Sequence, residues 1–304
     1  MKASRFVLSL AFIAATISNA QADDTLAKVK QSQSITEGVR EASGVMSYAL
    51  GNGAYTGFYY DVCGNIIHDL QKQLNLSRLD VKYVSVTSAN RIPLVRNGTV
   101  DLECGSTSNT QARQSEVAFA DTLYVEQIRI AVKANSGINS IYDLNGKTVV
   151  TTTGTTALQT VRQYKSLKHI DFREVYGKDH ADSFLLLESG RADAFVLDSQ
   201  VLAGRIAMAR NPKDYKIVGE PLSVEPIAIM IRKDDPEFKK AVDASIARQV
   251  KDGTVERLYK KWFMAPISPS NTSLNLPASN ATKNAWANLN DKPTEAYKVP
   301  AANP

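Results

Sequence analysis

The sequence predicts an α/β protein built from two similar units. A Leu-x-x-x-Gly-x-x-Asp pattern occurs twice, at residues 94–101 and 186–193, and each copy predicts a helix, a glycine stop and a buried strand. Two β-rich runs, near residues 124–132 and 224–232, would carry the chain out of the first unit and back. The repeated motif alone fits ordinary βαβ sequence equally well, so the prediction rests on both observations.

Residues 1–22 have the features of a secretory signal peptide. Lys2 and Arg5 give a positive start, residues 6–17 are apolar, and a small-x-small pattern ends at Ala22. The alternative is a membrane anchor, but the apolar run is short for a bilayer. We therefore expect cleavage after Ala22 and export to the periplasm.

Composition excludes several classes of function. The chain has 304 residues, long enough for two domains, with 43% hydrophobic and 22% charged residues. Removing Lys2 and Arg5 with the leader lowers the formal charge from +5 to +3, and the remaining basic residues are scattered, which argues against nucleic-acid binding. The three histidines lack metal-ligand spacing, and no nucleophile motif occurs. We expect no catalytic residue, metal or cofactor.

The sequence contains two cysteines, Cys63 and Cys104. Export would permit a disulfide between them. Two buried thiols are an equal alternative, because Cys63 falls in an apolar helical pattern and Cys104 at a strand end.

The first unit begins with an amphipathic helix over residues 24–33 and a strand over 34–40 that ends at Arg40. A helix with apolar residues at helical spacing is predicted from Gly57 to about Leu74. A second strand follows over residues 79–84.

The next stretch carries the most informative polar pattern. Ser88 or Asn90 can cap a short helix, and a strand then delivers its end to the Ser/Thr-rich loop 105–108. Such strand ends are where open α/β sheets place ligands. Arg91 and Arg113 flank this loop on either side.

The second unit repeats the plan. A strand over 148–152 precedes a helix that starts at Thr155 and Thr156, whose free amides predict an anion-binding end. A strand over 170–175 and a helix from His180 follow. The strand 194–197 ends at Asp198, before another helix.

The last part is predicted to return to the first unit. Residues 236–251 and 254–262 form helices, and an extended tail from Pro266 lies on the first unit. The resulting division is lobe 1, residues 23–127 and 229–304, and lobe 2, residues 128–228. Two extended segments between two lobes make a hinge suited to closure around a ligand.

With these features the chain resembles the periplasmic solute-binding proteins of family 3, most closely the branch that binds glutamate and aspartate. The resemblance covers nearly the whole chain after the leader, and its most specific pieces are TSANRIPLVRNGTVDLECGSTSNTQARQ, TTTGTTALQ, GKDHADSFLLLESGRADAFVLD and IRKDDPEFKK. It implies a type II periplasmic binding protein fold, with two α/β lobes joined by two hinge strands. It also implies a monomer that encloses an acidic amino acid and delivers it to an ABC transporter permease.

The resemblance also implies roles for individual residues. Arg113 matches the arginine that holds the ligand α-carboxylate, helped by Thr155 and Thr156, and Asp198 matches the partner of the ligand ammonium. The residues that match the site of the side-chain carboxylate are Arg40, Arg91 and His180, with Ser88, Ser106 and Ser108 as hydrogen-bonding partners. Two departures occur: Val45 and Met46 replace a Pro-Phe pair, and Ala112 replaces a glutamate.

The charges of these residues support acidic ligands independently. Glutamate and aspartate carry two carboxylates and one ammonium, which an excess of guanidinium groups over carboxylates complements. A neutral amino acid would leave a cation desolvated and unpaired, at a cost of about 3–5 kcal/mol.

Each residue also has a structural alternative. Arg40, Arg91 and Arg113 could face solvent, and the serines could form turns. His180 could be a helix-capping or half-buried histidine without a ligand. Asp198 could cap the helix that follows it.

Three other functions compete. An enzyme on this fold, such as a cyclohexadienyl dehydratase, would need a poised acid, for which Glu41 and Glu103 are the candidates. A binding protein for another polar amino acid and a ligand-binding module of a sensor are the others.

Overall fold

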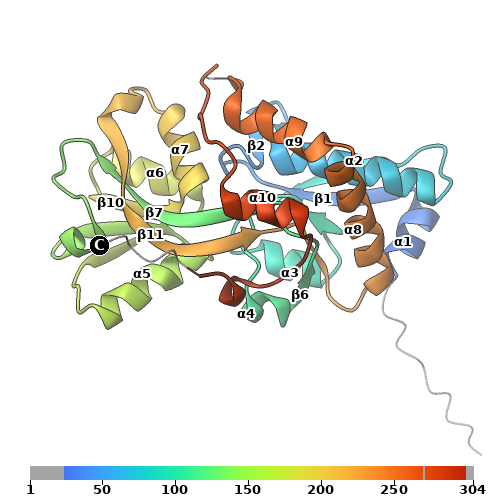
Figure 1. Cartoon of the computed structure of the whole chain (residues 1–304), viewed down its shortest axis with the longest axis horizontal. Coiled ribbons are helices and arrows are strands. Elements are labelled where there is room, and N and C mark those ends of the chain that lie inside the picture. Colours follow the sequence, from blue (N-terminus) through green and yellow to red (C-terminus); the bar gives the residue numbers. More distant parts are fainter. Residues whose placement is uncertain (1–23, 270, 299–304) are drawn as a thin grey trace, which may run out of the picture.

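Figure 1 shows the computed structural model, which describes residues 24–269 and 271–298. The predicted signal peptide, residues 1–22, and its cleavage site lie outside the described residues. No helix in the described part of the chain has both the length and the hydropathy of a membrane span.

The molecule consists of two α/β lobes, each built on a five-stranded sheet. The strand order is β4-β1-β5-β12-β6 in lobe 1 and β11-β7-β10-β8-β9 in lobe 2. The strands of lobe 1 are β1 (Ser34–Val39), β4 (Asp80–Ser85), β5 (Leu102–Glu103), β6 (Val117–Phe119) and β12 (Met230–Arg232). Those of lobe 2 are β7 (Tyr124–Lys133), β8 (Thr148–Thr152), β9 (Arg173–Gly177), β10 (Ala194–Asp198) and β11 (Tyr215–Ile227). In each sheet three strands run parallel, so their carboxyl ends meet at one edge.

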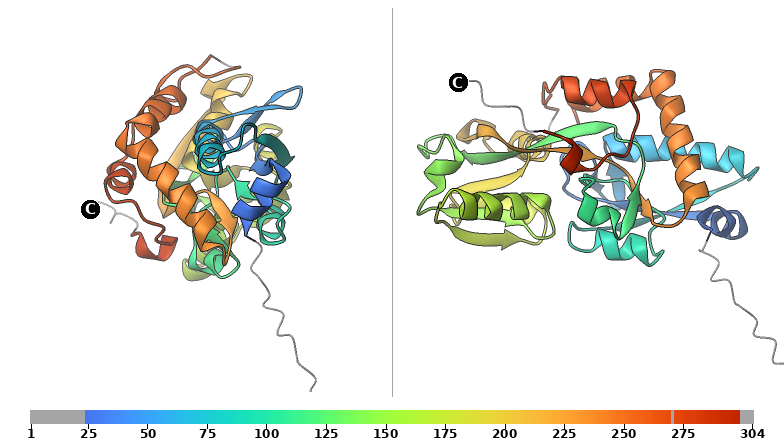
Figure 2. Two further views of the ribbon diagram at one scale, coloured as in Figure 1. Left: turned by 90° about the vertical axis from the view of Figure 1, so that its right-hand side faces the viewer. Right: turned by 60° about the horizontal axis from the view of Figure 1, so that its bottom comes forward.

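Helices cover the sheets, and Figure 2 shows them around both lobes. Lobe 1 carries α1 (Thr25–Ser32), α2 (Phe58–Gln73), α3 (Arg91–Arg96), α4 (Gln111–Gln114), α8 (Pro236–Lys251), α9 (Thr254–Tyr259) and α10 (Asn280–Ala287). Lobe 2 carries α5 (Thr156–Leu167), α6 (His180–Glu188) and α7 (Ser199–Ala207). The short turns are η1 (Ile141–Leu144), η2 (Pro212–Asp214), η3 (Lys260–Met264) and η4 (Thr294–Ala296), of which η3 is a π-helical turn.

Each lobe has its own hydrophobic core. Phe58, Phe238 and Phe263 pack in lobe 1, whereas Phe184 and Phe195 belong to a separate cluster in lobe 2. A fully buried side chain of this size contributes roughly 1.5–3 kcal/mol. Two independent cores mean that the lobes can move as bodies relative to one another.

Two strands connect the lobes. β7 and β11 pair antiparallel from Tyr124 opposite Ile227 to Ile128 opposite Ser223, and Figure 1 shows both crossing from one lobe to the other. β11 begins at Tyr215, earlier than the β-rich run predicted from residue 224. The register shifts between Val218 and Ser223.

The segment after Pro266 differs from the predicted extended tail. It contains α10, which lies across β7 and β11 (Figure 1). Trp286 Nε1 donates to the Leu123 carbonyl oxygen at 2.7 Å, and Val125 N donates to Thr282 Oγ1 at 3.1 Å. The tail therefore covers the hinge as well as lobe 1. The sequence pattern missed the helix because it offers few periodic apolar residues.

One further local prediction was wrong, and one element was not predicted. Neither Ser88 nor Asn90 caps α3 with its side chain in the described structure; Asn90 Oδ1 instead accepts from Thr87 N at 2.7 Å. The loop after Arg40 contains a small hairpin of β2 (Tyr48–Gly51) and β3 (Ala54–Thr56). Both departures are turn chemistry, which depends on neighbouring chain as well as local sequence.

The two cysteines form a disulfide. Cys63, in α2, is bonded to Cys104, directly after β5, and both are fully buried. The alternative of two free thiols is excluded. Because Gly105 follows Cys104 in the chain, the bond ties the start of the Ser/Thr-rich loop to α2.

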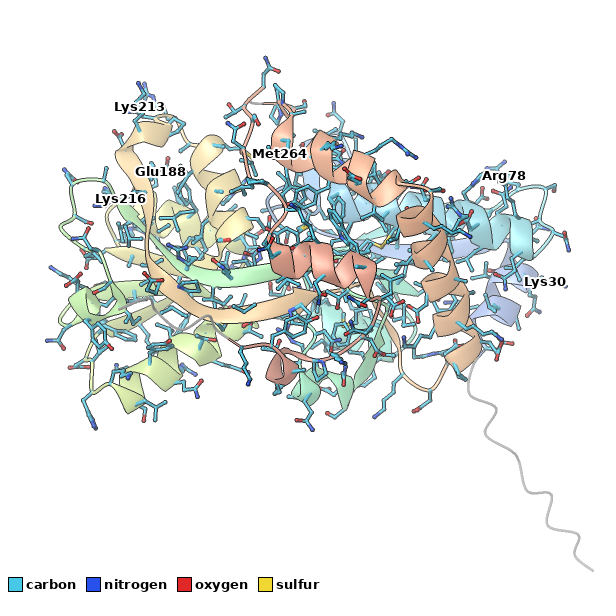
Figure 3. The ribbon with its side chains drawn as sticks, in the orientation of Figure 1. Lys30, Arg78, Glu188, Lys213, Lys216 and Met264 are labelled. Atoms are coloured by element: carbon cyan, nitrogen blue, oxygen red, sulfur yellow. A yellow bond between two sulfur atoms is a disulfide. The ribbon has the colours of Figure 1, made fainter. Side chains whose placement is uncertain are left out.

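The exposed charges are spread over both lobes. Figure 3 labels Lys30 and Arg78 at the outer end of lobe 1 and Lys213 on lobe 2, and all three are exposed. The scattered basic residues of the sequence are thus dispersed on the surface.

Candidate functional site

The ten residues predicted to bind ligand come together where the two lobes meet. Each has at most 9% of its surface exposed. They are Arg40, Ser88, Arg91, Ser106, Ser108 and Arg113 from lobe 1, and Thr155, Thr156, His180 and Asp198 from lobe 2. So many polar groups leave water at a cost, and they need polar partners in the enclosure.

Arg40 lies just after β1 and contacts both lobes. Its Nη2 donates to Ser88 Oγ at 3.0 Å and lies 3.2 Å from Nε2 of His180. Because a guanidinium only donates, His180 Nε2 must accept, and the ring proton sits on Nδ1. Nδ1 then donates to Thr152 Oγ1 at 3.0 Å.

His180 is therefore neutral. Burial, followed by the charges of Arg40 and Arg91, holds its pKa well below the usual 6.5. The resemblance groups His180 with Arg40 and Arg91 at the site of the ligand's side-chain carboxylate. In the structure the neutral His180 orients Arg40, and Asp179 rather than His180 caps α6.

Arg91, at the start of α3, lies beneath the serine loop. Its Nη1 donates to the Ser106 carbonyl oxygen at 3.2 Å and lies 4.0 Å from Glu103 Oε1. Glu103 also accepts from the Thr107 hydroxyl. Both Arg91 and Glu103 are fully buried, so this pair fixes the loop. Ser106 Oγ donates to Ser43 Oγ at 3.2 Å.

Arg113, in α4, bridges the lobes. Its Nη1 donates to the Ser108 carbonyl oxygen at 2.8 Å, and its Nη2 donates to the Gly154 carbonyl oxygen at 3.1 Å. Thr110 caps α4 by accepting from Arg113 N at 3.2 Å. The alternative of a surface arginine is excluded at this position, and the same holds for Arg40 and Arg91.

The start of α5 faces Arg113 from lobe 2. Thr155 caps the helix by accepting from Leu158 N. Thr156 Oγ1 donates to Glu225 Oε2 at 2.6 Å and lies 3.3 Å from Ser108 Oγ across the cleft. A helix N-terminus with free amides favours an anion at this point.

Asp198 ends β10 and precedes α7. Burial, followed by the charges of Glu126 and Glu225, raises its pKa well above the usual 3.8. Its carboxylate makes no capping bond to α7 among the described residues, contrary to the capping alternative. A cationic ligand group would favour its ionised form.

Glycines allow the lobes to approach closely. Gly154 has φ +83°, and a Cβ there would lie 2.6 Å from the Ser88 carbonyl oxygen. A Cβ on Gly204 of α7 would lie 3.0 Å from the Gly44 Cα. The lobes thus approach closely at Ser88–Gly154 and at Gly44–Gly204, which is the closed arrangement.

The cluster has an excess of buried cations. Burial lowers the pKa of Arg40 and of Arg113 to about 10, so both stay charged at neutral pH. Arg40 Nη1 and Arg91 Nε have no hydrogen-bond partner in the described part of the chain. Donors of this kind suit an anionic ligand.

The two candidate acids for an enzyme are not poised for catalysis. Glu41 is exposed and accepts from Ser85 Oγ at 2.8 Å. Glu103 is committed to Arg91 and Thr107. Sequence reasoning missed Glu126 and Glu225 entirely, because each is an isolated acid in a β-rich run. The replacements Val45 and Met46 are fully buried.

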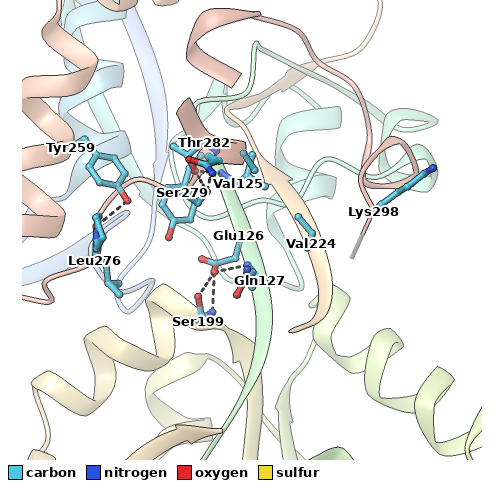
Figure 4. Close-up of a pocket in the computed structure, with 14 residues that line it drawn as sticks. Val125, Glu126, Gln127, Ser199, Val224, Tyr259, Leu276, Ser279, Thr282 and Lys298 are labelled. Carbon is cyan, nitrogen blue, oxygen red and sulfur yellow. Dashed lines mark hydrogen bonds between the residues drawn. The ribbon is translucent and has the colours of Figure 1, made fainter. Parts of the chain in front are cut away.

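A separate cavity of about 370 Å³ lies behind the hinge (Figure 4). Hinge-strand residues such as Glu126 and Val224 line one side, and Ser279 and Thr282 line the other. None of the ten predicted residues lines it. It is distinct from the polar cluster between the lobes.

Comparisons with known proteins agree with this geometry. The model of the bacterial extracellular solute-binding proteins, family 3, matches residues 35–265. The L-glutamate/L-aspartate-binding protein of Pseudomonas aeruginosa is 40% identical over 97% of this chain and 99% of its own length. The glutamate/aspartate import solute-binding protein of Escherichia coli is 40% identical over 96% and 98%. The solved structure of a mutant of ArgBP from T. maritima has a TM-score of 0.69 at 28% identity, over 78% of this chain and 98% of that one.

Proposed function

The chain belongs to the bacterial extracellular solute-binding proteins of family 3, and on that basis we propose that it captures L-glutamate or L-aspartate between its lobes. It then delivers the amino acid to the permease of an ABC transporter, acting as a monomer in the periplasm after cleavage at Ala22. It is a binding protein rather than an enzyme, as are the curated relatives. The observation that carries the proposal is the group of three buried arginines facing Asp198.

Each charge of the ligand has a partner in this proposal. Arg113 and the amides at the start of α5 hold the α-carboxylate, since both lie at the contact between Ser108 and Thr156. Arg40 and Arg91 hold the side-chain carboxylate. Asp198 pairs with the ligand ammonium, and the positive charge of the ammonium offsets the unfavourable burial of the Asp198 carboxylate.

Charge balance favours acidic over neutral amino acids. Glutamine or histidine would leave at least one arginine without an anionic partner inside the closed cleft. An orphaned buried charge costs about 3–5 kcal/mol, more than a hundredfold in affinity. Lobe closure around the ligand would then expel the water that could otherwise solvate it.

A thermal-shift screen of the twenty amino acids tests the proposal. Glutamate and aspartate should raise the melting temperature most, because a ligand at a hundred times its Kd stabilises the folded state by about 2.7 kcal/mol. Titration calorimetry then ranks the two. A larger shift with an uncharged amino acid would contradict the proposal, and size-exclusion chromatography checks the monomer.

A further inference from the structure

Asp198 occupies a helix-capping position without capping. It is the N-cap residue of α7, and aspartate is among the residues preferred there. Its carboxylate nevertheless makes no hydrogen bond to the first turn of the helix in the described chain. The first amides of α7 therefore need another acceptor.

Glu126 of β7 supplies that acceptor from outside the helix. Its Oε1 accepts from Ser199 N at 3.1 Å and from Ser199 Oγ at 2.6 Å (Figure 4). The Gln200 amide also interacts with this carboxylate. Ser199 and Gln200 are the first two residues of α7, so Glu126 bonds where an N-cap side chain would.

The placement of Glu126 is unfavourable unless it has such a role. It is 99% buried and lies directly opposite Glu225 in the β7–β11 pairing. Like charges at directly opposed strand positions are destabilising. Amides and a positive dipole at the start of a helix compensate a carboxylate. Gln127 N adds a further donor at 2.7 Å.

Glu225 contacts a different helix of lobe 2, α5. It accepts from Thr156 Oγ1 at the start of α5 and from Ser223 Oγ at 2.7 Å, and it does not contact α7 in the described contacts. The two opposed glutamates thus have separate targets. One reaches the helix next to Asp198 and the other the helix that faces Arg113.

We propose that Glu126 is a positioning residue that caps α7 in place of Asp198, and so leaves the Asp198 carboxylate available to the ligand ammonium. Without Glu126, the carboxylate of the N-cap residue Asp198 is an acceptor for the orphaned amides, and it turns to cap its own helix. This inference rests on the proposed function, because it assigns Asp198 to the ammonium.

A matched pair of substitutions tests it. Glu126→Met and Glu126→Gln have nearly the same length, but only glutamine keeps an oxygen acceptor for the α7 amides. The probes are L-glutamate and glutarate, which lacks the ammonium. Calorimetry should show Glu126→Met losing about tenfold more affinity for glutamate than for glutarate, since tenfold corresponds to 1.4 kcal/mol. Glu126→Gln should keep the glutamate-to-glutarate ratio within about threefold of the unmodified protein.

Glu225→Gln is the control on the opposite strand. It should change both affinities by the same factor, because both probes carry the carboxylate held near α5. A double-mutant cycle gives a second readout: Glu126→Met should cost less than about twofold in glutamate affinity once Asp198→Ala is present. Circular dichroism and the melting temperature without ligand establish folding of each variant.

The outcomes are separable. Equal losses for both probes in Glu126→Met, or an equal loss with and without Asp198→Ala, would overturn the inference alone. If Glu126→Met does not fold, Glu126→Gln decides, and a fall in its ratio beyond threefold overturns the inference. An unmodified protein that does not bind glutamate overturns the proposed function, and the inference with it.

Discussion

The two copies of the repeated motif have the same backbone structure, but the groups at their strand ends carry opposite charge. Asp101 Oδ2 accepts from Thr36 N at 2.9 Å in lobe 1, and Asp193 Oδ2 accepts from Thr148 N at 2.7 Å in lobe 2. In each copy an aspartate just before its strand therefore bonds to the neighbouring parallel strand, β1 in lobe 1 and β8 in lobe 2. The helix stops also match, since the two motif glycines have φ of 75° and 74°.

The copies diverge at the strand ends. Five residues after the aspartate, lobe 1 has Ser106 over buried Arg91, whereas lobe 2 has Asp198 before α7. Ser88 and His180, six residues before the repeated leucines, both contact Arg40. One backbone pattern thus brings two strand ends together. A few residue differences between the copies make the lobe 1 end cationic and the lobe 2 end anionic.

Removing a lobe 1 cation should have the largest effect. Arg40→Ala should weaken glutamate binding by about 3–5 kcal/mol, more than a hundredfold, and glutamine binding far less, because glutamine has no second carboxylate. Calorimetry with both ligands measures the difference. Arg78→Ala, at an exposed arginine paired with Asp80, is the control and should leave both affinities unchanged. Equal losses for the two ligands would remove Arg40 from the side-chain pocket.

The disulfide belongs to lobe 1 alone and should have the next largest effect. Cys63 and Cys104 are 41 residues apart, and closing such a loop stabilises a protein by about 4 kcal/mol in the chain-entropy model. The Cys63→Ala/Cys104→Ala variant should lose about that much in denaturant unfolding. An unchanged unfolding midpoint would show that the bond contributes little to stability.

The two motif aspartates should differ in their contribution. Asp101 is buried and also pairs with Lys28 at 2.8 Å, whereas Asp193 is exposed. Asp101→Ala should therefore cost about 2–3 kcal/mol, and Asp193→Ala about 1 kcal/mol. Urea unfolding of the two variants tests this order. Equal costs would mean that the shared strand contact outweighs burial.

The smallest effect concerns Glu37, which stands in β1 where Val149 stands in β8. Burial raises the pKa of Glu37 from 4.5 to about 8. Its protonated form stabilises the fold fully below pH 4.5, and this stability is lost as the pH rises through 8. Between pH 6 and pH 7 the free energy of unfolding of the unmodified protein should fall by about 1 kcal/mol more than that of the Glu37→Gln variant. Parallel pH curves for the two proteins would contradict a raised pKa.

Much of the fold followed from local sequence. The helix stops at Gly98 and Gly190, the strands before the polar loops and the two crossings depend on residues close together in the chain. For the same reason the polar strand ends identified Arg113, Thr155 and Asp198 as candidates. Where turns or a tail with few apolar residues were involved, as at α10 and the β2–β3 hairpin, local sequence did not suffice.

The sequence by itself determined which charged residues stand at strand ends and helix starts, because these positions follow from glycine, capping and apolar spacing. Only the tertiary structure decided how those charges behave. Arg40 and His180 are 140 residues apart, and burial together with the charge of Arg40 holds the pKa of the imidazole low and keeps it neutral. Burial of Asp198 beside Glu126 and Glu225 likewise depends on three strands meeting. The shifted pKa values, the disulfide and the capping of α7 by Glu126 all depend on residues that are far apart in the chain and are buried together by the fold. No local sequence pattern therefore contains them.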